Sequence, residues 1–124
     1  MSQIDELVAA FDGAIEGRDA DAFVAALAPG AIVWHNYDRK EVDARENMAA
    51  IAMLSQLVGG LKNEHLLLAP IDNGFVLQFV VHGTVNSSGN PFEMHNCIIV
   101  TTTDDGLMQR IDEYVDPTVG AQLS

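Results

Sequence analysis

The sequence predicts an α+β fold, in which an antiparallel β-sheet carries its helices on one face. Apolar residues recur at the helical period of 3.6 up to about residue 58 and alternate with a period of two after it. Turn signals such as Asp72-Asn73-Gly74 join the later strands, and strands joined by tight turns must run antiparallel. At 124 residues, 48% of them hydrophobic, the chain is expected to form a single domain over residues 1–124.

The first half of the chain is expected to hold three helices and one strand. Gly17 ends the first apolar helical stripe, and Asp19 can cap a second helix that stops at Pro29-Gly30. Asp43 is placed to cap the third helix, which Gly59-Gly60 ends. The expected elements are helices at 4–16, 20–28 and 43–58, with a strand at 31–36.

The second half is expected to consist of strands. Each segment is rich in branched and aromatic residues, and glycine-, asparagine- or aspartate-containing turns separate them. The expected strands are 61–70, 75–85, 91–103 and 107–116.

Composition excludes several functional classes. The net charge of −12 repels phosphate backbones, so no nucleic-acid partner is expected. Cys97 is the one cysteine, which excludes an internal disulfide, and neither a secretory signal nor an apolar run of about 20 residues is visible. A cytoplasmic protein without membrane contact is therefore expected. The four histidines show no HxH or HxxxH spacing and no glycine-rich phosphate loop is present, so neither a metal nor a cofactor is expected.

The strand at 75–85 has one wholly apolar face and one face that mixes apolar and polar residues. A mixed face of this kind either meets water or lines a small-molecule pocket, and both interpretations stay open. In the final strand, Glu113 shares a face with the apolar Ile111 and Val115. The apolar face of 75–85 carries Phe75, Leu77, Phe79 and Val81, and its mixed face carries Val76, Gln78, Val80 and His82.

The segments 17–36 and 104–117 resemble the nuclear-transport-factor-2-like superfamily, most closely its ketosteroid-isomerase and polyketide-cyclase (SnoaL-like) branches. The resemblance implies a cone-shaped, curved sheet packed against three N-terminal helices and enclosing an apolar pocket. It also implies a homodimer through the outer sheet face. On this view the partner subunit covers the apolar face of 75–85, and the pocket takes Val80 and His82.

The resemblance also suggests site residues. His35 falls where the isomerases place their catalytic base, Phe11 where they place a tyrosine, and Ile98 close to their protonated acid. Because both oxyanion donors are missing, steroid isomerisation by that mechanism is not expected. The acid of the cyclase branch falls on Glu113.

The expected catalytic residues are thus His35, as a base that titrates near neutrality, and Glu113, which would orient and charge-stabilise it. A histidine that merely bonds a backbone carbonyl at a strand end is the alternative. Whether His95 or Cys97 faces the pocket stays open, and Trp34 could equally be core. The expected substrate-binding residues are Phe11, Trp34, Gln78, His82, Asn96 and Ile98.

Two functions are compatible with these residues. The first is a cofactor-free acid/base enzyme, of isomerase, cyclase or dehydratase type, acting on an apolar substrate with a carbonyl or hydroxyl. The second is a non-catalytic dimerising module of the same fold that binds a ligand or a protein. A hydrogen bond between His35 and Glu113 inside an enclosed cavity would favour the enzyme.

Overall fold

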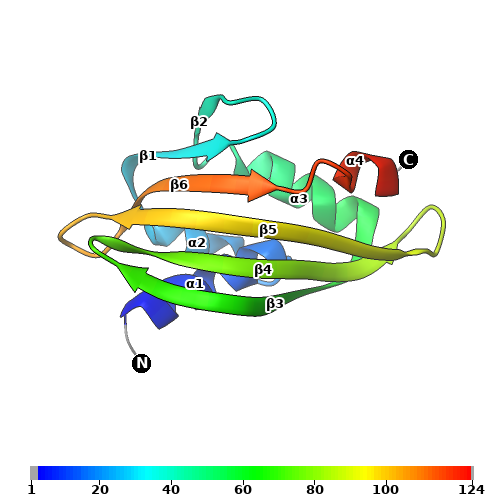
Figure 1. Ribbon diagram of the computed structural model, residues 1–124, viewed down its shortest axis with the longest axis horizontal. Helices are drawn as coiled ribbons and strands as arrows, with labels where there is room; N and C mark the ends of the chain where they lie inside the picture. The colour runs from blue at the N-terminus through cyan, green and yellow to red at the C-terminus, as the bar shows by residue number, and fades with distance from the viewer. Residues whose placement is uncertain (1–2, 124) are drawn as a thin grey trace.

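The computed structural model describes residues 3–123, which form one six-stranded sheet with helices (Figure 1). The order of elements agrees with the helix-rich first half and strand-rich second half expected from periodicity. The elements are α1 (Gln3–Ile15), α2 (Ala20–Ala25), β1 (Leu27–His35), β2 (Glu41–Asp43), α3 (Met48–Leu57), β3 (Val58–Ile71), β4 (Gly74–Val85), β5 (Pro91–Thr102), β6 (Met108–Val115) and α4 (Val119–Gln122).

The sheet has the strand order β2-β1-β6-β5-β4-β3. Tight turns join β3, β4, β5 and β6, which makes these neighbours antiparallel, as expected. β1 and β6 are parallel, because the chain between them leaves the sheet through α3 and returns through three strands. The mainly antiparallel curved sheet with N-terminal helices confirms the expected α+β fold class.

The helices cover one face of the sheet, here called the inner face, and the wholly apolar side of β4 points toward them. Phe75, Leu77, Phe79 and Val81 are fully buried, and the Phe79 ring meets Phe11 of α1 edge-on at 5.2 Å between centroids. The expectation that a partner subunit covers these residues is therefore wrong. A sheet buries its most apolar face in its own core first, because that burial drives folding.

Several element boundaries differ from those expected. Asp43 does not cap α3: its Oδ1 accepts hydrogen bonds from the backbone amides of Arg45 and Glu46, which forms a turn before the helix begins at Met48. Gly59-Gly60 lies inside β3 rather than before it. Pro29-Gly30 lies inside β1, where the pairing with β6 shifts register, and Gly30 has the positive φ of 73° that favours glycine.

Two short elements escaped the sequence analysis. β2 is three residues long and pairs with β1, and α4 is four residues long. Neither is long enough for periodicity to reveal it. Over residues 3–123, none of the helices has the length and apolar character that a bilayer crossing requires.

Candidate active site

His35 and Glu113 lie side by side on the inner face of the sheet. They occupy paired positions on the parallel strands β1 and β6. The imidazole Nε2 lies 3.2 Å from the carboxylate Oε1, and the side chains are only 7% and 16% exposed. The expected pairing of these two residues within hydrogen-bond reach is thus observed.

Strand alternation explains the polar end of β1. Trp34 points to the outer face, and its ring lies against Tyr114 of β6 with 5.4 Å between centroids. His35 points inward. Asn36 follows the strand and extends its pairing with β6, because its side chain accepts from the Val115 N–H at 2.9 Å and donates to the Val115 carbonyl at 3.4 Å. Each polar residue at this strand end therefore has a different task.

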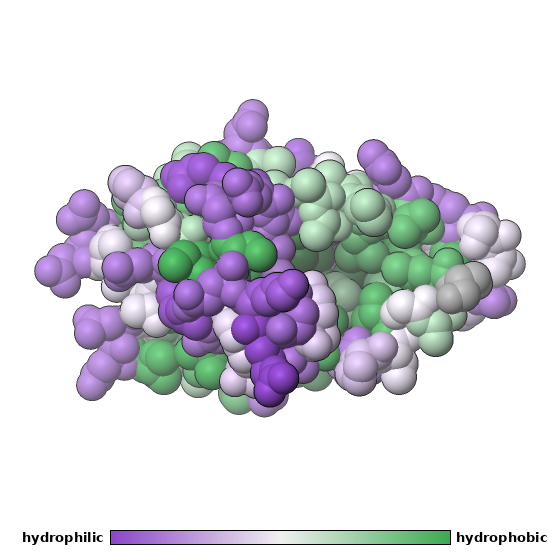
Figure 2. All heavy atoms as spheres, turned by 90° about the horizontal axis from the view of Figure 1, so that it is seen from above, coloured by the Kyte–Doolittle hydropathy of each residue, from purple (hydrophilic) through white to green (hydrophobic). Residues whose placement is uncertain are grey.

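A cavity of about 440 Å³ opens beside the His35–Glu113 pair. Its walls come from α3, α4, the ends of β1, β5 and β6, and Ile15 of α1. The lining is mostly leucine, isoleucine, valine and methionine, and the hollow in Figure 2 is accordingly surrounded by apolar side chains. This volume and this apolar lining with a few polar groups are typical of small-molecule sites, which measure roughly 300–1,000 Å³.

The electrostatics of the pair favour a protonated imidazole. The hydrogen bond to Glu113 raises the pKa of His35 above its ordinary value, and the negative charges of Glu113 and Asp38 act in the same direction. Burial lowers this pKa, but its effect is smaller than the combined effect of the hydrogen bond and the two charges. The arrangement therefore strengthens His35 as a base.

Tyr37 belongs to the same site and was missed by the sequence analysis. Its ring stacks on the His35 imidazole, with 5.0 Å between centroids and 30° between planes, and it lines the cavity. Partial burial raises the pKa of the Tyr37 phenol, and the charges of Asp38 and Glu113 add to this effect. The phenol therefore stays protonated at neutral pH and can donate a hydrogen bond.

Phe11, Ile98 and Trp34 do not line the cavity, contrary to the expectation that they bind substrate. Phe11 is buried between Phe23 and Phe79 in the core. Ile98 pairs with Glu113 across β5 and β6 and is buried behind it. Phe11 and Ile98 were assigned to the site because the isomerases carry polar groups at the corresponding positions. In this chain both positions are apolar, and both side chains pack into the core.

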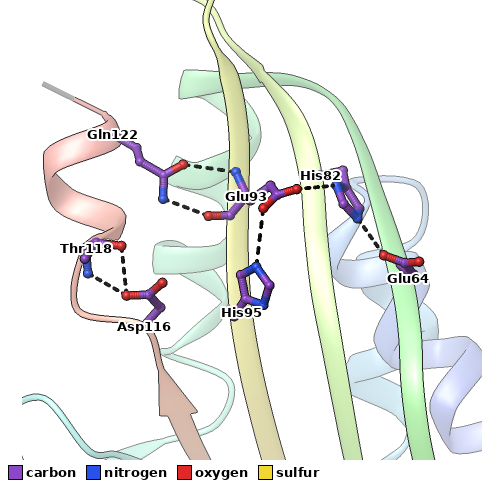
Figure 3. A network of polar contacts seen from close by, with 7 residues as sticks. All are labelled: Glu64, His82, Glu93, His95, Asp116, Thr118 and Gln122. Carbon is purple, nitrogen blue, oxygen red and sulfur yellow. Dashed lines mark hydrogen bonds and ion pairs between the residues drawn. The ribbon is translucent and has the colours of Figure 1, made fainter.

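Gln78 and His82 lie on the outer face of the sheet, so the expectation that they line the pocket is also wrong. The His82 ring lies between two carboxylates, 2.8 Å from Glu64 and 3.7 Å from Glu93 (Figure 3). His95 lies on the same face, 3.3 Å from Glu93. These histidine–glutamate contacts are partly exposed to solvent, as polar contacts on an outer sheet face normally are.

Cys97 and Asn96 point to opposite faces of β5. Cys97 pairs with Gln78 and Tyr114 on the outer face, and burial raises the pKa of its thiol, which disfavours the reactive thiolate. Asn96 points inward and is 6% exposed. The question left open by the sequence is thus resolved: both His95 and Cys97 face away from the cavity.

Several other residues that line the cavity were not predicted from the sequence. Met53 and Leu57 of α3 form the exposed rim, and Asp116 follows the end of β6. Met94 could have been found, because strand alternation places it on the same face as Asn96. The α3 and α4 residues carried no such signal, since the third helix was expected to start earlier and the fourth was not expected.

The fold is shared with solved structures of low sequence identity. IdmH from Streptomyces antibioticus, a proposed polyketide cyclase, is 17% identical, with a TM-score of 0.82 over 98% of this chain and 99% of its own. A proposed SnoaL-like polyketide cyclase from Jannaschia is 16% identical, with a TM-score of 0.82 over 98% and 91%. A protein with a ketosteroid-isomerase-like fold from Catenulispora acidiphila, solved with trimethylamine, is 16% identical, with a TM-score of 0.77 over 94% and 91%.

These likenesses confirm the nuclear-transport-factor-2-like fold that the sequence suggested. The sequence by itself matches no family model and no curated protein. At such identities the comparisons establish the architecture, and the chemistry must be argued from the site.

Proposed function

We propose that the protein is an acid/base enzyme of isomerase, cyclase or dehydratase type, which acts without a cofactor on a mostly apolar small molecule bearing a carbonyl or hydroxyl. The observation that carries the proposal is the buried His35–Glu113 pair at the wall of an apolar cavity. Titratable groups with a shifted pKa in such a cavity are candidates for catalysis. All three reaction types need one proton removed and one returned, which a single imidazole can do.

In this proposal His35 is the base and Glu113 orients it. An Nε2–H donated to the Glu113 carboxylate leaves the lone pair on Nδ1, the atom that takes the substrate proton. Glu113 then stabilises the imidazolium until the proton returns. Tyr37, whose raised pKa keeps its phenol protonated, is available to hold a substrate oxygen. Positioned proton transfer of this kind contributes about 10²–10⁴-fold to a rate.

A proton-exchange assay tests the proposal without knowledge of the product. Two-ring ketones such as 2-tetralone and 2-decalone fit a cavity of about 440 Å³, and deuterium uptake next to their carbonyl in D₂O can be followed by NMR. The protein should accelerate uptake about 100-fold or more over buffer, and His35→Ala should abolish the acceleration. His82→Ala removes an outer-face histidine and is the matched control, which should keep it.

The alternative is a non-catalytic, dimerising module that binds a ligand or a protein. The exposed rim of the cavity favours it, since Met53 and Leu57 are large apolar side chains left in solvent. If no ketone in the panel exchanges faster than in buffer, the enzyme proposal fails and the binding module stands. The proposal further includes a cytoplasmic location and a homodimer formed by the outer sheet face.

A further inference from the structure

Asn96 is a neighbour of two residues that line the cavity. On the inner face of β5 it stands between Met94 and Ile98, and it pairs with Val115 of β6 on one side and Phe79 of β4 on the other. Met94 and Val115 both line the cavity. Asn96 therefore adjoins the cavity wall along β5 and across to β6, although it does not line the cavity itself.

The Asn96 amide is buried without a hydrogen-bond partner. Among residues 3–123, nothing bonds to its Nδ2 or its Oδ1, and both atoms are inaccessible. Two other asparagines have partners: Asn36 bonds the Val115 backbone through both side-chain atoms, and Asn63 donates its Nδ2 to Asp12 at 2.8 Å while its Oδ1 has no partner. Buried polar side chains are normally paired, because leaving them unpaired costs stability. Asn96 thus lowers the stability of the fold, and no hydrogen bond within residues 3–123 to its side chain offsets this cost.

The position of Asn96 relative to the catalytic pair fits a role toward a ligand. Glu113 pairs with Ile98 and Val115 pairs with Asn96, so Glu113 and Asn96 are diagonal neighbours on one face. Such neighbours lie roughly 7–8 Å apart, which is within the span of a two-ring molecule. Met94, the next residue on the same face of β5, lines the cavity with an unbranched, flexible side chain that can change rotamer when a ligand enters.

We infer that Asn96 is a ligand-recognition residue at the deep end of the cavity, which pairs with a carbonyl oxygen and an adjacent N–H or O–H of the ligand. A carboxamide side chain presents a donor and an acceptor next to each other, so the matching group presents the reverse pair, as a carboxamide, a lactam or a hydroxy-ketone does. The inference deepens the proposed function and rests on the cavity as a ligand site. It does not require turnover.

Two probes that share the naphthalene ring system test the inference in a binding titration. 2-Naphthamide carries the donor–acceptor pair, and 2-ethylnaphthalene carries none. The unmodified protein should bind 2-naphthamide about tenfold more tightly, and Asn96→Leu should remove this preference. His82→Ala, which changes the outer face only, should keep the preference, and because the titration measures binding and not proton exchange, a failure here is distinguished from a failure of the catalytic proposal.

Thermal unfolding provides the second readout. Asn96→Leu replaces an unpaired amide by an apolar group of similar size, so its Tm should equal or exceed that of the unmodified protein. Asn63→Leu is the matched control: it removes an amide that is bonded to Asp12, and its Tm should fall. A lowered Tm or failed folding of Asn96→Leu, a preference that survives in it, or no preference in the unmodified protein would each overturn the inference.

Discussion

His35 and Glu113 stand opposite each other on two parallel strands, with the imidazole Nε2 3.2 Å from the carboxylate Oε1. The chain between these strands runs through α3, and α3 also forms one wall of the cavity beside the pair. The cavity therefore has the His35–Glu113 pair in one part of its wall and α3 in another. Because the pair is buried, its charge state is measurable through stability.

The pKa of His35 should lie above about 6.5 in the folded protein and fall in Glu113→Gln, because the hydrogen bond to Glu113 is the largest cause of the shift. An NMR titration of the imidazole measures it. Some elevation should persist in the variant, since Asp38 also raises this pKa. An unchanged pKa in Glu113→Gln contradicts the arrangement.

The same shift predicts how stability depends on pH. A pKa that is higher in the folded state contributes stability that is fully present below the unfolded value, about 6.5, and is lost as pH rises through the folded pKa. The free energy of unfolding of the unmodified protein should therefore exceed that of Glu113→Gln most between about pH 5 and 6.5. The difference should shrink above the folded pKa. Urea unfolding across this range measures it, and a difference that grows toward alkaline pH is the opposite result.

The proposed catalytic pair, His35 and Glu113, should behave as one unit in the ketone exchange assay. His35→Ala and Glu113→Gln should each remove nearly all acceleration, and the double variant should lose little more than either single one, since residues acting together are strongly non-additive. Deuterium uptake of 2-tetralone by NMR measures all three. Losses that multiply in the double variant would mean that the two side chains act independently.

The polar residues of this site that lie on strands were predictable from the sequence. Strand alternation and the family resemblance placed His35 and Glu113, and alternation also separated Asn96 from Cys97. Alternation divides a strand into two faces but does not say which face the helices cover. For this reason the prediction took the outer face of β4 for its inner face, and Gln78 and His82 were wrongly assigned to the pocket. Tyr37 follows the end of β1 in an irregular segment, where no periodic pattern exists to place it.

The outer sheet face should mediate a homodimer, although not through the residues first expected. Leu67 of β3 and Tyr114 of β6 are 48% and 46% exposed on this face, and Trp34 lies beside Tyr114. Exposed apolar side chains of this size on a sheet favour a covered surface. Sedimentation at micromolar concentration should give a dimer, and Leu67→Glu should shift it to the 13.4 kDa monomer.

The control for this prediction is Met53→Glu, which places the same charge on an exposed apolar residue at the cavity rim instead. That variant should remain dimeric. A monomeric unmodified protein, or equal dissociation of both variants, would rule out the outer face as the interface.

Gln122 should hold α4 against the sheet and thereby keep the cavity wall in place. β6 ends at Val115, which pairs with Asn96 of β5. The part of β5 that precedes Asn96 therefore has no strand beside it on the β6 side. The Gln122 amide replaces that neighbour: it accepts from the Glu93 N–H at 3.0 Å and donates to the Glu93 carbonyl at 2.7 Å (Figure 3).

Gln122→Ala should therefore accelerate hydrogen exchange at the Glu93 amide and weaken binding of 2-naphthamide, because α4 and the residue that follows it supply Val119 and Leu123 to the cavity. The loss of two partly exposed hydrogen bonds should cost about 1–2 kcal/mol of stability. Gln122→Glu keeps an acceptor for the Glu93 N–H but loses the donor, so its exchange rate should fall between the two. Gln78→Ala, a substitution of an exposed glutamine on the outer face, should leave the Glu93 amide unchanged. NMR-detected exchange measures all four proteins, and a Glu93 amide that is equally protected in Gln122→Ala would show that α4 is held by its apolar contacts alone.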